Sequence, residues 1–371
     1  MVALARFSQA LGSIDQYYFW KGRVALYALL KSCGVAPGDE VVMQAFTCVA
    51  VPNPVIYLGA KPIYVDVDPQ TYTMSVAGLH DAITEKTKVI IVQNSFGHPP
   101  DYKPILKLAQ SKNIVVIGDC AHGMGARYDG DYDGFLADAS IYSFQWTKPV
   151  TTGLGGMAVV KNAEKFPFLA DTIRDEFHHP ALNDQLMLRI QYFVHKILLH
   201  PRSYWSLIAL YRLLSRMGLK VASSSAEELT MDTMPDGFAK TMSNWQQRNV
   251  AVKMEKLEEI VLKRRETAEY YDSVCIEIGI EAAFQAEGSY HSYLRYPIKV
   301  ASSALAFDMA KKNRIQIGEW FKEPVDPSLG NEIRFHYRRG SCPVAELLCK
   351  RVINLPTDNP LTKKELLSLI S

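Results

Sequence analysis

The sequence lacks most features that mark secreted, zinc-binding or nucleic-acid-binding proteins. Its six cysteines among 371 residues form no CxxC pair and no secreted-scaffold spacing. We therefore expect reduced thiols in a cytoplasmic protein and no metal site. The 41 basic and 39 acidic residues nearly cancel, which argues against nucleic acid as a partner. No basic region followed by an apolar run opens the chain, so we expect no secretion signal.

One stretch lacks acidic residues altogether. Residues 186–220 are rich in apolar and aromatic side chains and include six basic residues. The longest uncharged run is too short for a membrane-spanning helix, which needs about 20 apolar residues. Two interpretations stay open: a helical insertion at about 180–225 that packs on the sheet or on a second subunit, or amphipathic helices at an anionic membrane surface.

What is present suffices for a large core, because 48% of the residues are hydrophobic. The first 160 residues alternate helical patterns with short, continuous, β-branched runs. Such runs favour a mostly parallel sheet covered by helices on both faces. We therefore predict an α/β fold with a large domain over residues 1–245, followed by a smaller α+β domain over residues 246–371.

Four elements are predicted for the smaller domain, one of them a helix over residues 304–313 that Asn313 closes. A single amphipathic helix is expected over residues 243–274, and a strand is expected over residues 292–300. Residues 342–356 read as one further helix that ends before Pro356.

Lys148 is the first candidate for chemistry. It follows a predicted strand and precedes the glycine-rich turn of residues 151–156. A lysine on a loop is most often an ordinary surface residue. The functional alternative is a Schiff-base lysine, whose amine must be partly desolvated to lose its proton.

Two further signals lie where ligands bind in open α/β sheets, beyond the carboxyl ends of strands. Asp119 ends a predicted strand; it either caps the next turn or pairs with the pyridinium nitrogen of pyridoxal phosphate. The predicted helix start at Gly22, Arg23 and Val24 offers backbone N–H groups to a phosphate. Ser143 adds a hydroxyl donor.

Together these segments resemble the DegT/StrS-type sugar aminotransferase family of fold type I pyridoxal-phosphate enzymes. The similarity is poorest between about residues 165 and 245, and the matching segments are residues 22–42, 59–74, 81–92, 118–130, 138–160 and 342–356. The resemblance implies a large domain with a mostly parallel sheet between helices and a smaller C-terminal α+β domain.

The resemblance also implies roles for the matched residues. Lys148 would form the Schiff base with pyridoxal phosphate and then move protons at the substrate carbon. Ser143 would bind the cofactor phosphate, Asp119 would pair with the pyridine nitrogen, and His122 would lie near the oxygen of the ring. Some members carry histidine in place of the lysine and act as dehydratases, so Lys148 favours transamination.

Departures from the family pattern concern cofactor contacts. Gly22-Arg23 replaces the usual Gly-Thr or Gly-Ser, so the side-chain contact to the phosphate must differ. Cys48 stands where an aromatic residue often stacks on the cofactor ring, and we expect Phe46 or His122 to cover the ring instead.

A further departure lies in residues 235–247. Ala239 and Thr241 occupy the Asn and Arg positions of a family segment whose Asn reaches the partner subunit's phosphate. We expect Lys240 to replace that cross-subunit contact.

The implied reaction moves an amino group from an amino acid, expected to be glutamate, to a nucleotide-linked keto sugar in glycan or envelope polysaccharide biosynthesis. The enzyme would be a cytoplasmic homodimer, with peripheral contact to the inner face of the membrane if residues 186–220 are amphipathic. Two alternatives stay open: sugar dehydration or other carbonyl chemistry with the same cofactor, and a non-catalytic regulatory protein of this fold. Candidate acceptor contacts, each equally compatible with a packing role, are Tyr17, Phe19, Trp20, Gln145, Trp146 and residues 319–324.

Overall fold

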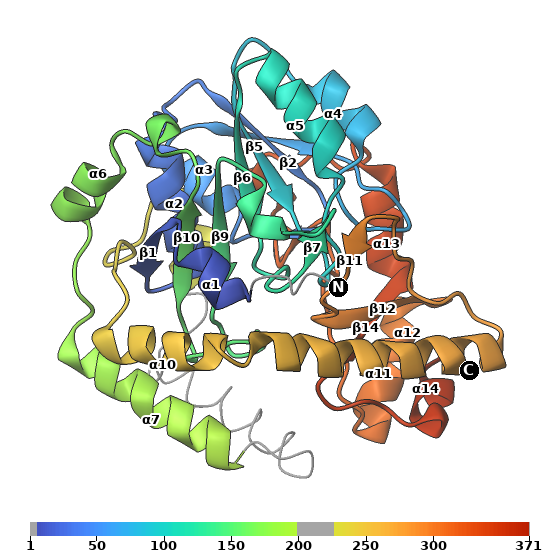
Figure 1. The fold of residues 1–371 in the computed structure, drawn as a ribbon. Coiled ribbons are helices and arrows are strands. Elements are labelled where there is room, and N and C mark those ends of the chain that lie inside the picture. The colour runs from blue at the N-terminus through green and yellow to red at the C-terminus, as the bar shows by residue number, and fades with distance from the viewer. Residues whose placement is uncertain (1–5, 199–225, 371) are drawn as a thin grey trace.

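The computed structural model describes residues 6–198 and 226–370. A seven-stranded sheet with the order β1-β10-β9-β6-β5-β2-β4 forms its centre (Figure 1). Strands β9, β6, β5, β2 and β4 run parallel, whereas β10 runs antiparallel to both of its neighbours. The predicted α/β fold with a mostly parallel sheet is therefore confirmed. The strands are β1 (Asp15–Phe19), β2 (Glu40–Gln44), β4 (Lys61–Val65), β5 (Thr87–Gln93), β6 (Val115–Asp119), β9 (Ala139–Ser143) and β10 (Gly156–Val160).

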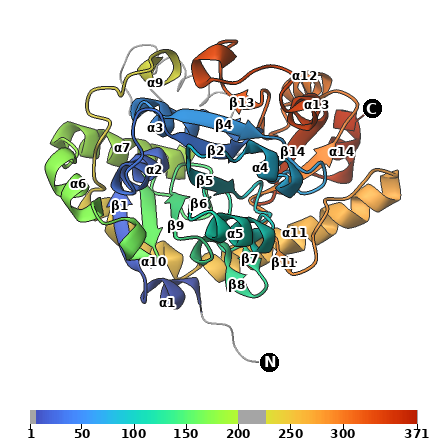
Figure 2. The ribbon, with the colours of Figure 1, turned by 90° about the horizontal axis from the view of Figure 1, so that it is seen from above.

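Helices cover both faces of this sheet, as the continuous apolar runs predict. Within β2, Val41 and Met43 join the core on the face covered by α2, and Val42 joins the core beneath α5. Figure 2 shows α2 and α5 on opposite sides of the sheet. The helices before residue 199 are α1 (Phe7–Leu11), α2 (Gly22–Ser32), α3 (Pro52–Tyr57), α4 (Val76–Ala82), α5 (Tyr102–Ser111), α6 (Leu169–Glu176) and α7 (Leu182–Leu198).

The long helix predicted over residues 243–274 is divided into two. Helices α10 and α11 follow one line across Figure 1, with a turn at Glu255 and Lys256 between them. Neither glycine nor proline stands at this turn, and nothing in the structure explains it. The helices of this part are α9 (Ala226–Thr230), α10 (Asn244–Met254), α11 (Leu257–Ile278), α12 (Ser303–Asn313), α13 (Pro343–Arg351) and α14 (Lys363–Ile370).

The single helix predicted over residues 342–356 is wrong in its last five residues. Helix α13 ends at Arg351, and β14 (Val352–Pro356) then pairs antiparallel with β12 (Arg295–Lys299). Val352 and Ile353 are β-branched and buried, and the neighbouring strand supplies the hydrogen bonds that a helix would have supplied.

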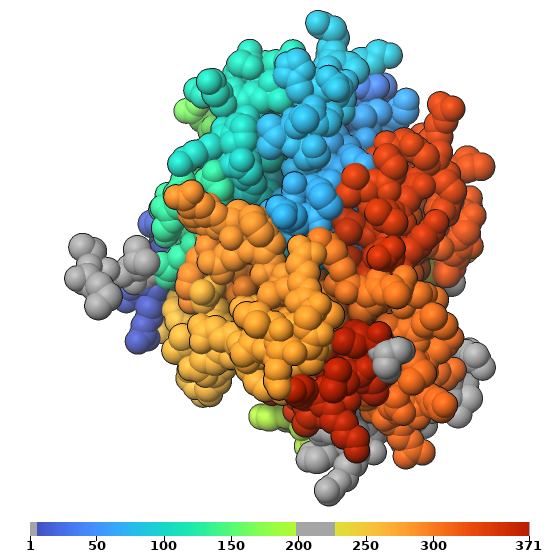
Figure 3. All heavy atoms as spheres, turned by 90° about the vertical axis from the view of Figure 1, so that its right-hand side faces the viewer, coloured from blue at the N-terminus to red at the C-terminus, as the bar shows by residue number. Residues whose placement is uncertain are grey.

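Short strands bring the C-terminal part to the large sheet. Strand β3 (Thr47–Cys48), just beyond the end of β2, pairs with β13 (Val325–Asp326). A further small sheet consists of β11 (Ser289–Tyr290), β7 (Arg127–Tyr128) and β8 (Asp131–Tyr132). Figure 3 shows the orange and red C-terminal residues directly against light-blue residues of the large sheet's part of the chain. The division at residue 245 stays a prediction.

The acid-free segment is described only in part. Its first residues form the end of α7, and residues 199–220 lie outside the described chain. In residues 6–198 and 226–370, no helix combines the length and apolarity that crossing a bilayer requires.

The contact between β10 and the start of α2 gives a test of this packing. A Cβ atom at Gly156 would collide with the backbone of Lys21 and Gly22. Gly156→Ala should therefore destabilise the protein by about 1–3 kcal/mol, measured as a lower melting temperature by calorimetry. Gly12→Ala is the control, since the nearest atom to its Cβ lies 3.4 Å away. Equal melting temperatures for the two variants would contradict the packing.

Candidate active site

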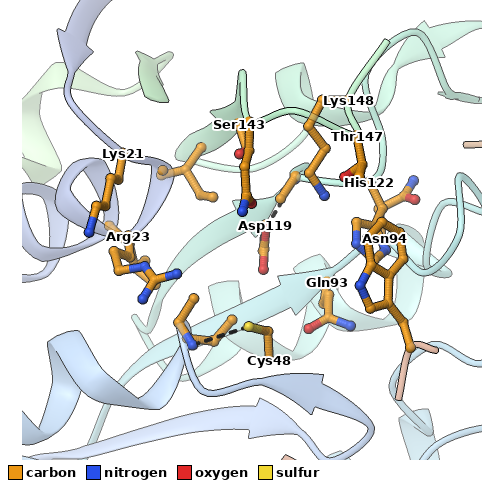
Figure 4. A pocket seen from close by; sticks show the side chains of 18 of the residues that line it. Lys21, Arg23, Cys48, Gln93, Asn94, Asp119, His122, Ser143, Thr147 and Lys148 are labelled. Carbon is orange, nitrogen blue, oxygen red and sulfur yellow. Dashed lines mark hydrogen bonds between the residues drawn. The ribbon is translucent and has the colours of Figure 1, made fainter. Parts of the chain in front are cut away.

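A cavity of about 320 Å³ opens at the carboxyl edge of the sheet (Figure 4). The last residues of three neighbouring parallel strands line it: Gln93 of β5, Asp119 of β6 and Ser143 of β9. The first turn of α2 forms one wall (Figure 4), and Trp320 and Phe321 from the C-terminal part also line the cavity. Residues from both ends of the chain therefore meet at the place where α/β sheets bind ligands.

Lys148 lies on the loop between β9 and β10, and its side chain extends into the cavity (Figure 4). Its backbone N–H donates to the carbonyl of Gln145 at 2.9 Å. The residue is 8% exposed, and burial lowers the pKa of its amine from 10.5 to about 8. Asp119 and Cys48 oppose this shift, and the positive charge of Arg295 adds to it. Lys148 is thus a desolvated amine and not an ordinary surface lysine.

Asp119 both accepts a hydrogen bond within the next turn and lines the cavity, the two positions that its sequence context allows. Its Oδ1 accepts the N–H of Ala121 at 3.0 Å, which is a turn contact, and the residue also lines the cavity. Burial raises the pKa of the carboxyl, while the Ala121 N–H and Lys148 lower it. A cationic nitrogen in the cavity would favour the ionised carboxylate.

His122 presents a neutral ring to the cavity. Burial lowers its pKa far below 6.5, and the charges of Lys148 and Arg295 lower it further. Its Nδ1 accepts the N–H of Phe96 at 3.3 Å, so the ring proton lies on Nε2. The ring stacks on Trp320 with 4.8 Å between centroids.

The start of α2 approaches the end of β9 closely. A Cβ atom at Gly22 would lie 3.4 Å from both Cβ of Ser143 and the carbonyl oxygen of Tyr142. This closeness brings the first turn of the helix and the Ser143 hydroxyl to one wall of the cavity (Figure 4). The helix dipole and the hydroxyl make this wall suitable for an anion.

Two cations beside this wall share an internal carboxylate. Glu228 of α9 is 3% exposed, and its oxygens lie 2.9 Å from Lys21 Nζ and 2.7 Å from Arg23 Nη1. Sequence reasoning missed Glu228 because more than 200 residues separate it from α2.

Several residues predicted to contact the cofactor do not line the cavity. The side chain of Val24 is in the core, and its N–H donates to the Lys21 carbonyl at 3.1 Å. Lys240 bonds to Asp184 at 2.8 Å, and Phe46 is buried against Phe321. His122, the other candidate for covering the ring, does line the cavity, as do Cys48 and Arg23.

The residues predicted to contact the sugar acceptor also fall into two groups, those that pack within the protein and those that line the cavity. Phe19 packs on Phe177, and Trp20 packs in a small core with Leu154. Trp146 packs against His195 of α7, with 4.7 Å between the centroids of their tilted rings. Tyr17 packs against the core on the α2 face of the sheet. Gln145, Trp320 and Phe321 line the cavity.

Other residues near the cavity were missed. Gln93 and Asn94 line it, and the end of β5 was the available signal. Arg295, at the start of β12, is 8% exposed, and its guanidinium carbon lies 5.5 Å from the centroid of Trp320. No local motif marks Arg295, because its approach depends on the fold of the C-terminal part.

The donors of this cavity suit pyridoxal phosphate. The group needs a phosphate site, an acid for its ring nitrogen, a flat surface near the ring and an amine for its aldehyde. The α2 turn with Ser143, the Asp119 carboxylate, the His122 ring and the Lys148 amine respectively offer these features. A volume of about 320 Å³ falls in the usual range of small-ligand sites.

Comparison with known proteins shows the family of the chain. The model of the DegT/DnrJ/EryC1/StrS aminotransferase family matches residues 16–191 and 203–371. The chain is 44% identical to GDP-perosamine synthase of Escherichia coli O157:H7 over 141 residues. That match covers 38% of this chain and 39% of the relative, so it spans well under half of either protein.

Two solved structures have a similar fold. One is a sugar aminotransferase of Streptococcus pneumoniae in its PMP form, with a TM-score of 0.71 and 22% identity over 98% of this chain and 86% of that chain. The other is a GDP-4-keto-6-deoxymannose-3-dehydratase, with a TM-score of 0.72 and 16% identity over 98% of this chain and 90% of that chain. The family match over most of the chain shows that the protein belongs to the DegT/DnrJ/EryC1/StrS aminotransferases, a family of pyridoxal-phosphate-dependent enzymes.

Proposed function

We propose that this protein transfers an amino group from glutamate to a keto group on a nucleotide-linked sugar. One observation carries the proposal: a buried Lys148 amine with a pKa of about 8 shares a cavity with Asp119, His122 and Ser143. Burial of this kind makes a lysine a nucleophile and a base near neutral pH.

Each residue has a defined task in this proposal. Bound pyridoxal phosphate supplies an aldehyde that accepts amines and a ring that withdraws electrons from the substrate carbon. Ser143 and the N–H groups at the start of α2 hold the phosphate. Asp119 keeps the ring nitrogen protonated, and the Nε2–H of His122 is available to donate a hydrogen bond. Lys148 would hold the aldehyde end of the cofactor. Once the substrate amine has displaced it there, the free Lys148 amine would carry the proton from the donor carbon to the former aldehyde carbon.

Arg295 is our candidate for recognising the amino donor. Its guanidinium carbon and the Lys148 amine lie 5.5 Å and 5.0 Å from the centroid of the same Trp320 ring. An amino acid that reacts at Lys148 must place its α-carboxylate within a few ångströms of that amine. A guanidinium can bind a carboxylate with two parallel hydrogen bonds. We therefore propose that Arg295 binds the donor carboxylate beside Trp320.

The acceptor is proposed from the family and its relatives. GDP-perosamine synthase and a 3-aminotransferase named for a UDP-linked sugar are similar to this chain over about two fifths of its length. Gln145 and Trp320 line the cavity and are candidates for contacting the sugar. A nucleotide-linked keto sugar for glycan or envelope polysaccharide synthesis is therefore the proposed acceptor.

The second candidate function is dehydration of such a sugar. The similarity of fold to a sugar dehydratase favours it, because that enzyme has the same overall architecture. The amine of Lys148 in the cavity supports transamination instead. The presence of Lys148, Asp119, His122 and Ser143 in one cavity argues against a purely regulatory protein.

The assembly and location are also proposals. We propose a cytoplasmic homodimer, in which Lys240 reaches the partner's cofactor phosphate. Within one chain, Lys240 forms an ion pair with Asp184. The pKa of Lys21 is lowered first by burial, then by the charge of Arg23, and to a smaller extent by the charge of Lys240. These contacts are all within one subunit, so the cross-subunit role of Lys240 is proposed from its place in the family segment of residues 235–247.

Glutamate should convert the cofactor on the purified enzyme to its amine form. Titration should shift the visible absorbance of the bound cofactor, and Lys148→Ala should slow this shift by about 10²–10⁴-fold, because the base is lost. Lys161→Ala, an exposed lysine at the end of β10, is the matched control. Visible absorbance without a response to glutamate would favour the dehydratase.

Cofactor capture should depend on pH around the pKa of Lys148. The neutral amine attacks the aldehyde, so the rate should rise with pH and reach half of its maximum near pH 8, the pKa lowered by burial. At pH 7 about one amine in ten is neutral. Stopped-flow mixing of cofactor-free protein with pyridoxal phosphate measures this rate. A midpoint near the ordinary lysine value of 10.5 would contradict the desolvated site.

Replacing Arg295 should affect the donor and not the sugar. Loss of a charged hydrogen-bond pair in Arg295→Gln should raise the KM for glutamate about 10- to 100-fold. Arg295→Lys should restore part of this loss, because it keeps the charge without the planar fork. Steady-state kinetics with both substrates varied would show an unchanged KM for the acceptor. A larger effect on the acceptor would contradict the assignment.

A further inference from the structure

An exposed apolar stripe runs along α7, and the described chain leaves it uncovered. Five residues at helical spacing form the stripe, and each is between 49% and 81% exposed: Leu182, Leu186, Ile190, Phe193 and Ile197. At 3.6 residues per turn they lie within about 80° of arc. A continuous stripe of this kind marks an interaction surface, in contrast to scattered exposed residues.

The opposite face of α7 packs against the rest of the protein. Leu188 is buried with Trp20 and Leu154. Tyr192 contacts Trp245 of α10 at 5.3 Å between centroids and accepts a hydrogen bond from Lys253. Figure 1 shows α7 at the outer edge of the molecule beside α10. The stripe is therefore not needed for the packing of α7.

The charges around the stripe indicate the chemistry of its partner. The exposed Lys196 lies along one edge, within about 40° of arc from the stripe. Arg189, on the same edge, packs its guanidinium over Trp245, 5.7 Å from the ring centroid. The one acid on α7, Asp184, is bonded to Lys240 at 2.8 Å. From Gln185 to Ala226 the sequence contains neither Asp nor Glu, although the whole chain is nearly neutral. The partner should therefore be both apolar and anionic.

A second copy of the chain fits this requirement poorly. A symmetric contact through the stripe would place the basic edge of one copy near the same edge of the other. Like charges in an interface oppose association. An anionic bilayer, in contrast, accepts apolar side chains at the boundary with its acyl chains and attracts basic side chains to its headgroups.

We propose that the stripe of Leu182, Leu186, Ile190, Phe193 and Ile197, with Lys196 at its edge, docks the enzyme on an anionic membrane surface. The helix lies in the plane of the interface and does not cross it. This inference is independent of the reaction, because none of these residues lines the cavity.

Sedimentation of the full-length, cofactor-loaded protein with vesicles tests the proposal. The protein should bind vesicles that contain phosphatidylglycerol and bind pure phosphatidylcholine vesicles at least about tenfold more weakly. Ile190→Glu/Phe193→Glu should lower binding to the anionic vesicles at least about tenfold. Lys196→Gln should weaken binding to the anionic vesicles and leave binding to the phosphatidylcholine vesicles unchanged.

Matched controls separate the stripe from general hydrophobicity. Leu305→Glu/Ile333→Glu also introduces two acids at exposed apolar sites, which are 65% and 86% exposed, and it should bind vesicles like the parent protein. Melting temperatures and cofactor absorbance should be unchanged in both double variants, because each replaced side chain is already exposed.

Three results would overturn the proposal. The first is a parent protein that does not sediment with anionic vesicles, and the second is equal binding by the stripe variant and its control. The third is a smaller oligomer of the stripe variant in light scattering, which would assign the stripe to a second copy of the chain.

Discussion

The burial of the Lys148 amine is the constraint on which the site depends. A lysine normally stays charged at neutral pH, and its removal from water lowers the pKa of this one to about 8. The cost of that burial is offset by Asp119 beside it and by the face of Trp320, 5.0 Å from the amine. A reactive amine therefore exists only where the sheet edge and the C-terminal part close over it.

This constraint links distant parts of the fold to one cavity. The pairing of β3 with β13 holds the segment of Trp320 and Phe321 near the end of β2. The close approach of Gly22 to Ser143 brings the helix start to the same edge. On the other side, Trp146, two residues before Lys148, rests on His195 of α7. Helix α7 thus connects the loop of the reactive lysine with the exposed apolar stripe.

The sequence was enough to predict those site residues whose positions depend on neighbours close in sequence. Ser143 and Lys148 are five residues apart on one strand and loop, and Asp119 ends a continuous apolar run, so their convergence followed from the rule for strand ends. Glu228, Arg295 and the placement of Lys240 could not be predicted in this way. Each depends on contacts between segments far apart in sequence. Residues 352–356 were misassigned for the same reason, since their strand partner β12 lies more than 50 residues earlier.

Reduction of the loaded enzyme with borohydride, followed by peptide mass spectrometry, tests the central claim most directly. Borohydride makes the bond between an amine and the cofactor aldehyde permanent, so the modified residue reports which amine the cavity presents. The account predicts one pyridoxyl group per chain, on the peptide that contains Lys148. A modification at another lysine, such as Lys21 at the start of α2, or none at all, would contradict it.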